Sequence, residues 1–307
     1  MKCGCGKKAV IFRRYEGLHL CKNCFCKSIE KRVKRTVRQN NMIKKDDRIA
    51  FGLSGGKDSS VVLYIMLQIL KPMKADFFAF TIDEGIKGYR DGSIRIAKKL
   101  CKKLDVKYHI YSYKEHLGTT LDKKMEEVRK NPDLLQTNCS YCGVARRYLL
   151  NKVARDLKAT KLCVGHNLDD ETQTIIMNYV RGDMAKASRM GAITDYSIPK
   201  DGTFVPRIKP LRGIPEKEVT LYALLKGLDV QEDECPYASG IRFDVRDFLN
   251  SMEHKYPGIK FSVLESFDKM LPIVRTFVDK QKKKIRHCKK CGEPSSEEIC
   301  NACKMWS

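Results

Sequence analysis

The sequence has no long hydrophobic run, and its first residues lack the apolar stretch of a secretory signal. A membrane-spanning helix needs roughly 18 consecutive apolar residues. No segment approaches that length, so we expect no membrane partner. Without a secretory signal in Met1-Lys2-Cys3-Gly4-Cys5, a cytoplasmic location is expected. The central part of the chain shows no internal repeat. Its 307 residues suit one core of about 200 residues with small additions.

Acidic residues are too few to balance the basic ones. The chain has 37 Asp and Glu against 60 Lys and Arg, which gives a formal net charge of +23. Such an excess attracts polyanions, because their binding releases condensed counterions. The plainer alternative is a Lys-rich surface that only aids solubility. We expect a nucleic acid partner, and we disfavour an anionic membrane because no amphipathic anchor is evident.

The basic residues are concentrated in two segments, 27–45 and 280–290. No helix breaker interrupts 28–39, so the first segment is predicted to form a basic helix. Helical spacing would place four of its side chains on one face, namely Lys31, Lys34, Arg35 and Arg38. This helix would either contact RNA or serve as a solvated linker.

Between the two basic segments, short buried strands alternate with helices. The expected strands are 48–53, 75–82, 106–111 and 162–165, and the expected helices are 59–70, 91–104, 169–180, 216–225 and 245–252. This alternation predicts an α/β fold with a doubly wound parallel sheet covered on both faces. Residues 182–206 are less regular and are expected to form a loop near the site.

The first strand runs into a glycine loop, Ser54-Gly55-Gly56-Lys57-Asp58-Ser59, and then into a helix. Glycines permit a tight turn with exposed N–H groups, and a helix N-terminus attracts phosphate. Ser54 and Ser59 would add hydroxyl donors and Lys57 a positive charge, whereas Asp58 would hold magnesium or cap the helix. The spacing is not that of a Walker A loop. It resembles the SGGxDS loop of PP-loop ATP pyrophosphatases, HUP-like enzymes that split ATP between the α and β phosphates and adenylate a carbonyl-type oxygen.

Two other strand ends fit the same site. Ile82 ends the second strand at the carboxyl edge, where ligands bind in open α/β folds. In PP-loop enzymes the backbone there reads adenine. The segment 165–170, which begins at Gly165, resembles the family's GHNxDD motif. Its carboxylates would serve magnesium bound to ATP. We expect Asp169 to cap the following helix and Asp170 to be functional.

Fourteen cysteines in a cytoplasmic chain indicate metal sites where they cluster. Two C-x2-C pairs near the C-terminus predict a four-thiolate zinc site, at Cys288, Cys291, Cys300 and Cys303. So short a module lacks the apolar content to fold without metal. A second structural zinc site is predicted near the N-terminus, at Cys3, Cys5, Cys21 and Cys24. Its first pair has a one-residue gap, so His19 and Cys26 are possible substitutes, although we expect a solvated ring and a spare thiol.

A separate pair, Cys139 and Cys142, lies mid-chain, and Cys235 follows later. The pair alone could be half a zinc site, a redox pair or an iron–sulfur anchor. Cys101 and Cys163 lie in apolar segments and are expected to be structural. Three thiol ligands leave one coordination position open, which suits a cluster that binds an exogenous group better than it suits structural zinc.

These features together resemble the TtuA and cytosolic tRNA uridine 2-thiolation family. The resemblance rests on the glycine loop, the GHNLDDE segment, the cysteine pair and three further segments, 208–212, 214–218 and 234–237. It implies that Cys139, Cys142 and Cys235 hold a 4Fe–4S cluster and that ATP with Mg²⁺ activates a tRNA uridine. It also implies that Arg146 contacts the nucleotide, that the fingers flank the RNA path, and that the chain forms a homodimer. Some members have Lys at the position of Arg146, which alters the geometry.

The resemblance implies a domain division. It gives an N-terminal zinc finger over 1–26, a basic linker helix over 27–48, a PP-loop catalytic domain over 49–279, and a basic segment with the C-terminal zinc finger over 280–307.

The predicted activity is that of a tRNA sulfurtransferase. The uridine C2 oxygen attacks the α-phosphate of ATP, and sulfur held by the cluster then displaces AMP. A variant without a cluster would carry a persulfide on one of Cys139, Cys142 and Cys235. The many Cys and Asn residues are atypical of thermophiles, which favours the wobble uridine over the T-loop uridine. The sulfur donor would be free sulfide or the thiocarboxylate of a ubiquitin-like sulfur carrier.

Two other classes of function remain as alternatives. Another PP-loop RNA modifier, such as a lysidine synthetase or a 2-thiocytidine enzyme, would lack either the cysteine triad or the paired fingers. A non-enzymatic zinc-finger RNA-binding protein would not need the intact loop from Ser54 to Ser59.

Overall fold

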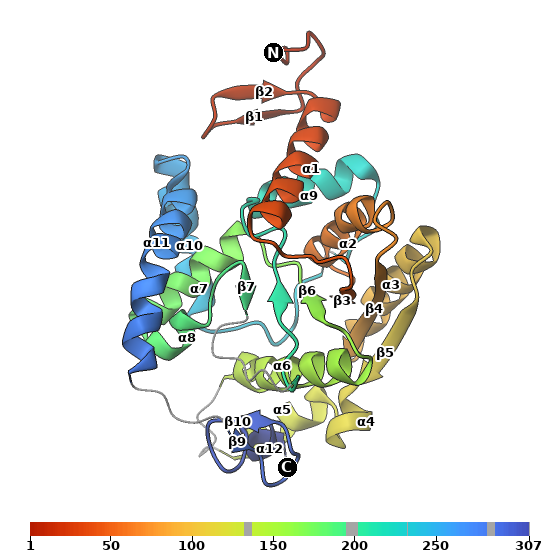
Figure 1. Cartoon of the computed structure of the whole chain (residues 1–307), viewed down its shortest axis with the longest axis vertical. Coiled ribbons are helices and arrows are strands. Elements are labelled where there is room, and N and C mark those ends of the chain that lie inside the picture. The colour runs from red at the N-terminus through yellow and green to blue at the C-terminus, as the bar shows by residue number, and fades with distance from the viewer. Residues whose placement is uncertain (132–136, 195–201, 232, 281–285, 307) are drawn as a thin grey trace.

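A six-stranded sheet lies at the centre of the structure, a computed structural model that describes residues 1–131, 137–194, 202–231, 233–280 and 286–306 (Figure 1). The strand order is β5-β4-β3-β6-β8-β7. The strands are β3 (Arg48–Gly52), β4 (Asp76–Asp83), β5 (Tyr108–Ser112), β6 (Lys161–Cys163), β7 (Ile193–Thr194) and β8 (Arg207–Ile208). All neighbours pair in parallel except β7 with β8. The predicted α/β fold with a mostly parallel sheet is confirmed.

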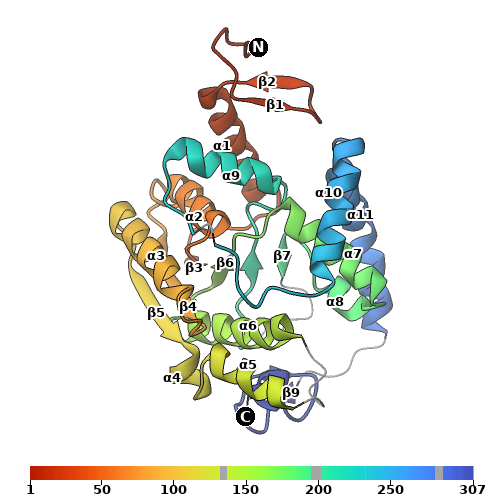
Figure 2. The same ribbon diagram turned by 180° about the vertical axis from the view of Figure 1, so that it is seen from behind.

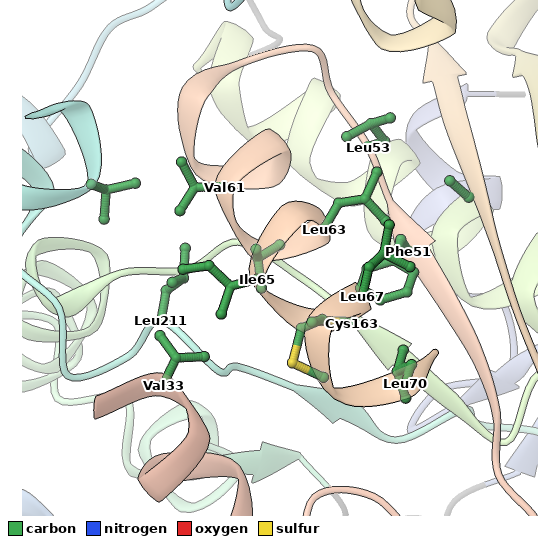
Figure 3. Packing of buried hydrophobic residues seen from close by; sticks show 14 of the residues in the cluster. Val33, Phe51, Leu53, Val61, Leu63, Ile65, Leu67, Leu70, Cys163 and Leu211 are labelled. Atoms are coloured by element: carbon green, nitrogen blue, oxygen red, sulfur yellow. The ribbon is translucent and has the colours of Figure 1, made fainter. Parts of the chain in front are cut away.

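Successive side chains of each strand point to opposite faces of the sheet. Apolar clusters and helices cover both faces, as is usual for a parallel sheet. In β3, Ile49 and Phe51 join one apolar cluster and Ala50 joins another. The first cluster is covered by helices α1 (Lys22–Gln39), α2 (Lys57–Leu70), α3 (Arg90–Leu104) and α9 (Glu216–Lys226). Figure 3 shows this packing, with Val33 of α1 lying close to the side chains of α2.

The opposite face is covered mainly by α6 (Asn138–Asp156), together with α4 (Tyr113–Leu117) and α5 (Leu121–Lys130). A further group of helices lies beside the β7 edge in both views (Figures 1 and 2). It comprises α7 (Leu168–Val180), α8 (Met184–Ser188), α10 (Arg242–Lys255) and α11 (Ile259–Asp279). Among the described residues, no helix combines the length and the apolarity needed to cross a membrane.

The two cysteine-rich ends of the chain lie at opposite ends of the molecule (Figures 1 and 2). The N-terminal module has a hairpin, β1 (Ile11–Arg13) paired with β2 (Leu18–Leu20), and leads directly into α1. The C-terminal module has β9 (Arg286–His287), β10 (Pro294–Ser295) and α12 (Asn301–Trp306). Residues 281–285, which carry three of the seven basic residues of the second basic segment, lie outside the described residues.

Several sequence predictions were displaced or wrong. Residues 182–206 contain α8 and β7, so the expected loop is partly ordered, and 195–201 lie outside the described residues. The sequence did not predict β7 or β8, because a strand of two residues is too short to show an alternating pattern. The sequence did not predict α11, which has Pro272 in its interior, a position where proline normally ends a helix. The basic helix expected over 28–39 is present and begins six residues earlier, at Lys22.

The N-terminal module is fixed to the core by a buried ion pair. The Arg13 guanidinium donates to both oxygens of Glu218, at 3.1 and 2.8 Å, and both side chains are almost fully buried. The Tyr15 hydroxyl donates to the same carboxylate at 2.5 Å, and Arg32 lies 3.6 Å from it. Glu218 raises the pKa of Arg13 against the opposing effect of burial. The orientation of the N-terminal module therefore depends on one carboxylate in the first turns of α9.

Replacing this carboxylate should be strongly destabilising. The change Glu218→Ala would leave the buried Arg13 charge with only the more exposed Glu16 as its partner, at a cost on the order of 3 kcal/mol in the free energy of unfolding. Guanidinium chloride titration followed by circular dichroism measures the change. The control Asp229→Ala breaks the exposed pair between Lys99 and Asp229, which should leave the free energy of unfolding close to that of the parent because solvent screens the pair. Equal losses in both variants would contradict this assignment.

Candidate active site

The glycine loop turns tightly because two glycines allow close backbone contacts. Gly55 has φ +85°, and a Cβ there would lie 2.3 Å from the carbonyl oxygen of Ser93. A Cβ on Gly165 would lie 2.7 Å from the backbone carbon of Asp58. The Ser54 and Ser59 hydroxyls are 3.0 Å apart. No side chain caps α2, so the N–H groups of its first turn are available to phosphate oxygens.

Charged side chains surround the start of α2. The Lys57 ammonium lies 3.1 Å from Asp58 and 2.7 Å from Glu216. Burial opposes its charge, but these carboxylates raise the pKa of Lys57. Burial raises the pKa of Asp58, partly offset by Lys57 and by a 2.9 Å hydrogen bond from Asn167. Asp58 does not cap the helix, because Gly56 occupies the N-cap position. Its magnesium role stays a prediction.

The GHNxDD segment begins α7, but its capping differs from the prediction. Asn167 is the N-cap and forms a capping box with Asp170. Asp169 does not cap α7, and that prediction was wrong. It accepts the N–H of Glu216 at 2.7 Å, at the start of α9, and pairs with the Lys260 ammonium. The reason is that Asn167 already occupies the position whose side chain meets the free N–H groups.

Asp170, on α7, lies close enough to Asp58 at the start of α2 to raise the pKa of Asp58. Burial raises the pKa of Asp170, and Arg242, 3.5 Å away, partly offsets the effect. A carboxyl group whose negative charge is penalised by burial gains from a nearby cation. Its proximity to the glycine loop through Asn167 keeps it a candidate for ATP-bound magnesium.

Two buried residues that the sequence reasoning missed, Glu84 and Arg90, join the glycine loop to the second strand. Arg90 donates to the carbonyl oxygens of Ile82 at 2.7 Å and Ser54 at 3.2 Å. Its Nε lies 2.7 Å from the Glu84 carboxylate. The Ile82 carbonyl is thus already engaged by Arg90. Glu84 follows the carboxyl end of β4, and that position was the signal that could have found it.

The three mid-chain cysteines lie in segments that the fold connects to the glycine loop. Cys139 and Cys142 lie in the first turns of α6, which begins at Asn138. The Cys139 thiol donates to the carbonyl of Tyr237 at 3.6 Å, which links it to the segment of Cys235. The Gln231 N–H in turn donates to the Gly55 carbonyl at 2.9 Å. Gln231 therefore lies at the glycine loop, and Tyr237 lies at the cysteine pair.

A series of charged groups makes a second connection between the glycine loop and the cysteine pair. Arg146 donates to the Cys142 sulfur at 3.1 Å and to Glu84 at 2.9 Å. Burial raises the pKa of Cys142, and Arg146 opposes this by stabilising the thiolate. Burial also raises the pKa of Cys235, again offset by Arg146. Cys142, Arg146, Glu84, Arg90 and the Ser54 carbonyl thus follow one another in contact.

Each terminal module gathers four thiols. Within the part of the chain described, only two groups of at least three potential ligands have all their ligand atoms within 4.8 Å of one another: Cys3, Cys5, Cys21 and Cys24, and Cys288, Cys291, Cys300 and Cys303. The Cys5–Cys21 and Cys291–Cys300 sulfurs are each 3.6 Å apart. Tetrahedral zinc with bonds of about 2.3 Å requires sulfurs about 3.8 Å apart, so both sets fit zinc.

The cysteine and histidine residues outside these sets have other environments. Cys26 lies on α1 and is buried in the core, and His19 stacks on Phe12 with ring centroids 4.4 Å apart. Cys101 and Cys163 are buried in the same apolar cluster, and Figure 3 shows Cys163 among aliphatic side chains. Burial raises the pKa of Cys101 to about 12, as expected for a structural thiol. The Cys139, Cys142 and Cys235 sulfurs do not form a group as compact as the zinc sets, which agrees with a larger cluster.

Comparisons with known proteins agree with this site. A PP-loop domain model matches residues 26–250, and a model of the N-terminal LIM domain of 2-thiouridine synthetase TtuA matches residues 2–26. The tRNA 2-thiolation protein NcsA of Haloferax volcanii is 37% identical over 99% of this chain and 98% of that protein. The tRNA-5-methyluridine(54) 2-sulfurtransferase of Pyrococcus horikoshii is 36% identical over 100% of this chain and 94% of that protein.

A solved structure extends the comparison to the fold. The U34-tRNA thiolase NcsA from Methanococcus maripaludis, with its 4Fe–4S cluster, superimposes with a TM-score of 0.83 and 35% identity, covering 99% of this chain and 95% of that one. These matches and the sheet topology define an enzyme of the PP-loop class. Within that class the chain belongs to the TtuA and cytosolic tRNA uridine 2-thiolation family of sulfurtransferases, which confirms the resemblance of the motifs.

The contact of Gly165 with the glycine loop yields a direct test of the ATP site. In Gly165→Ala, the new Cβ would press on the Asp58 backbone and displace the loop. A displacement of about 1 Å at a reacting group can cost about 100-fold in rate, so we expect at least a tenfold loss in kcat/KM for ATP. Pyrophosphate release at varied ATP concentration measures it.

The matched control is Gly213→Ala, because a Cβ there meets nothing within 4 Å. It should leave kcat/KM for ATP within about twofold of the parent. A normal ATP dependence in Gly165→Ala would show that the loop does not hold the triphosphate.

Proposed function

We propose that the chain is an ATP-dependent tRNA uridine 2-thiolase. The observation that carries the proposal is the double connection between the glycine loop and the cysteine triad, through Gln231 on one side and through Arg90, Glu84 and Arg146 on the other. A site that only hydrolysed ATP would not need thiols there. Family membership supplies the acceptor class.

The first step would be adenylation of the uridine. The uridine C2 oxygen attacks the α-phosphate of ATP, one phosphate–oxygen bond forms, and the bond to pyrophosphate breaks. The open N–H groups of α2 and the Ser54 and Ser59 hydroxyls would hold the phosphates, with Lys57 adding a positive charge. Asp58 and Asp170 would hold magnesium, which binds carboxylates and phosphate oxygens together. Arg146, charged and adjacent to Cys142, would stabilise negative charge on the α-phosphate.

The second step would exchange oxygen for sulfur. Hydrosulfide adds to C2 of the adenylated base, and AMP leaves with the former C2 oxygen, so the product is 2-thiouridine. A 4Fe–4S cluster bound by Cys139, Cys142 and Cys235 would supply an iron with an open position for hydrosulfide. The triad fits such a group, because Arg146 compensates the negative charge of two of its thiols. A persulfide on one of the three cysteines is the alternative chemistry.

The tRNA would lie across the exposed side of α1. Five basic side chains there are exposed, and the described residues form no ion pair with them; they are Lys27, Lys31, Lys34, Arg35 and Arg38. Arg32 is different, because it turns inward to Tyr15 and the Gly213 carbonyl. The opposite face of α1 is buried in the core, so the helix presents its charge in a fixed orientation. This favours RNA contact over a purely linking role.

The wobble uridine is the proposed target, with the T-loop uridine as the alternative. The structural relative from Methanococcus maripaludis is named a U34-tRNA thiolase and aligns with almost the whole chain. The relative from Pyrococcus horikoshii, with almost the same identity, is named for position 54. The many Cys and Asn residues, which are atypical of thermophiles, favour the wobble position.

Several further expectations belong to the same proposal. We propose two structural zinc ions in the terminal modules and the division into domains at residues 1–26, 27–48, 49–279 and 280–307. The sulfur donor would be free sulfide or a ubiquitin-like carrier thiocarboxylate. A cytoplasmic location is proposed because zinc thiolates and free thiols persist in a reducing compartment, and a homodimer is proposed from the family.

The function is tested with anaerobically purified protein, unmodified tRNA, ATP and sulfide. We expect 2-thiouridine at position 34 by mass spectrometry of tRNA fragments, with one AMP formed for each thiolated base. In Cys235→Ala, iron and acid-labile sulfide should fall and thiolation should drop by at least about 100-fold. The control Cys101→Ala removes a core thiol. Thiolation by cluster-free protein would favour the persulfide chemistry over the cluster. A lack of AMP formation would contradict the proposed ATP-dependent thiolation.

The proposed RNA face is tested by charge reversal. The double variant Lys34→Glu and Arg35→Glu should weaken tRNA binding at least tenfold and lower the salt dependence by about two counterions. Filter binding at several salt concentrations measures both quantities. The control double variant, Lys98→Glu and Lys102→Glu, makes the same change in net charge at two exposed residues of α3. If it weakened binding equally, only net charge would matter and the α1 face would have no special role.

A further inference from the structure

The C-terminal module packs directly on α6, the helix that carries Cys139 and Cys142. In both views α12 and the β9–β10 hairpin lie beside α6 and α5, far from the N-terminal module (Figures 1 and 2). Glu293 of the module is buried, pairs with the Arg155 guanidinium, and accepts from Asn151 at 3.4 Å. The module is thus held to the C-terminal half of α6 by a buried, charge-assisted contact.

Trp306 holds the other end of the same helix. Its side chain is only 6% exposed, and its Nε1–H donates to the carbonyl of Tyr141 at 3.1 Å. Tyr141 lies between the two cysteines. The Trp306 ring meets the Tyr113 ring edge-on, with centroids 5.0 Å apart. The Tyr113 hydroxyl donates to the Cys142 carbonyl at 2.9 Å and lies 3.7 Å from the Cys142 sulfur.

We propose that Trp306 is a positioning residue for the Cys139–Cys142 pair, so that the C-terminal module braces the cluster ligands. This rests on the proposed function only in that the pair holds a cluster. Among the described residues, no side chain caps the first turn of α6, and helix ends fray. Trp306 restrains that turn at the Tyr141 carbonyl and, through Tyr113, at Cys142. Partners that orient metal ligands commonly decide how firmly the metal is held.

The brace also links the two kinds of metal site. Cys300 and Cys303 lie beside α12 and within it, a few residues before Trp306. Folding of so small a module depends on its metal. Zinc in the C-terminal module would therefore affect retention of the cluster through Trp306, without any direct contact between the metals.

The test measures how fast the reconstituted protein loses iron to a chelator under anaerobic conditions. Trp306→Ala should lose iron about tenfold faster than the parent, with unchanged ATP binding and zinc content. Trp306→Phe, which keeps a ring but lacks the N–H, should be intermediate. The control Lys289→Ala removes one side of an exposed pair with Glu298 in the same module and should match the parent. If Trp306→Ala kept its iron as the parent does, the brace would be refuted.

A second variant covers the case in which Trp306→Ala fails to fold. Trp306 is the only tryptophan of the chain, so its emission reports whether the module is docked. Glu293→Ala should shift the emission to longer wavelength and accelerate iron loss in parallel. A shifted emission with unchanged iron retention would overturn the proposal. Parent protein that binds no cluster at all would instead count against the proposed function.

Discussion

The site depends on one buried carboxylate between two arginines. Glu84 is 3% exposed and faces Arg90 on one side and Arg146 on the other. A buried charge is tolerated only when it is paired, so the three groups hold one another in place. Arg90 then ties the carboxylate to the backbone of the glycine loop, and Arg146 ties it to Cys142. The glycine loop and the cysteine pair, the proposed phosphate and sulfur sites, are both connected to this carboxylate.

The same principle recurs where peripheral elements join the core. Glu218 fixes the N-terminal module through Arg13, Asp169 joins α7 to α9 and to Lys260, and Glu293 fixes the C-terminal module through Arg155. In a chain of net charge +23, many of the scarce acidic residues are used inside the structure. The unpaired positive charge remains on the surface, where it can meet a polyanion.

The two terminal modules have different relations to the site. The N-terminal module continues into α1 and so sets the orientation of the exposed basic side chains. The C-terminal module contacts α6 beside the cysteine pair. Similar ligand sets at the two ends therefore serve two tasks. In the proposed function, the N-terminal module concerns the approach of RNA, and the C-terminal module concerns the geometry of the cysteines.

Local patterns made much of the fold and of the loop predictable. The glycine loop, the alternation of strands and helices, and the C-x2-C spacings act over short stretches, so they can be recognised without tertiary structure. The short strands β7 and β8 were not predicted, because two residues cannot show a periodic pattern. Helix α11 was not predicted, because Pro272 lies in its interior, where proline normally ends a helix. Asp169 was given the wrong partner because a cap for α7 and a cap for α9 look alike in sequence.

The sequence by itself determined which chemical groups the chain carries: a glycine loop, a mid-chain cysteine pair with a third cysteine after it, two four-thiol sets and a large positive net charge. Tertiary structure alone decided how these parts meet. Glu84 and Arg90 have no motif, and Trp306 lies 164 positions or more from both cysteines that it braces. Contacts of this kind arise when parallel strands end at a common edge and distant helices pack, which no local pattern encodes.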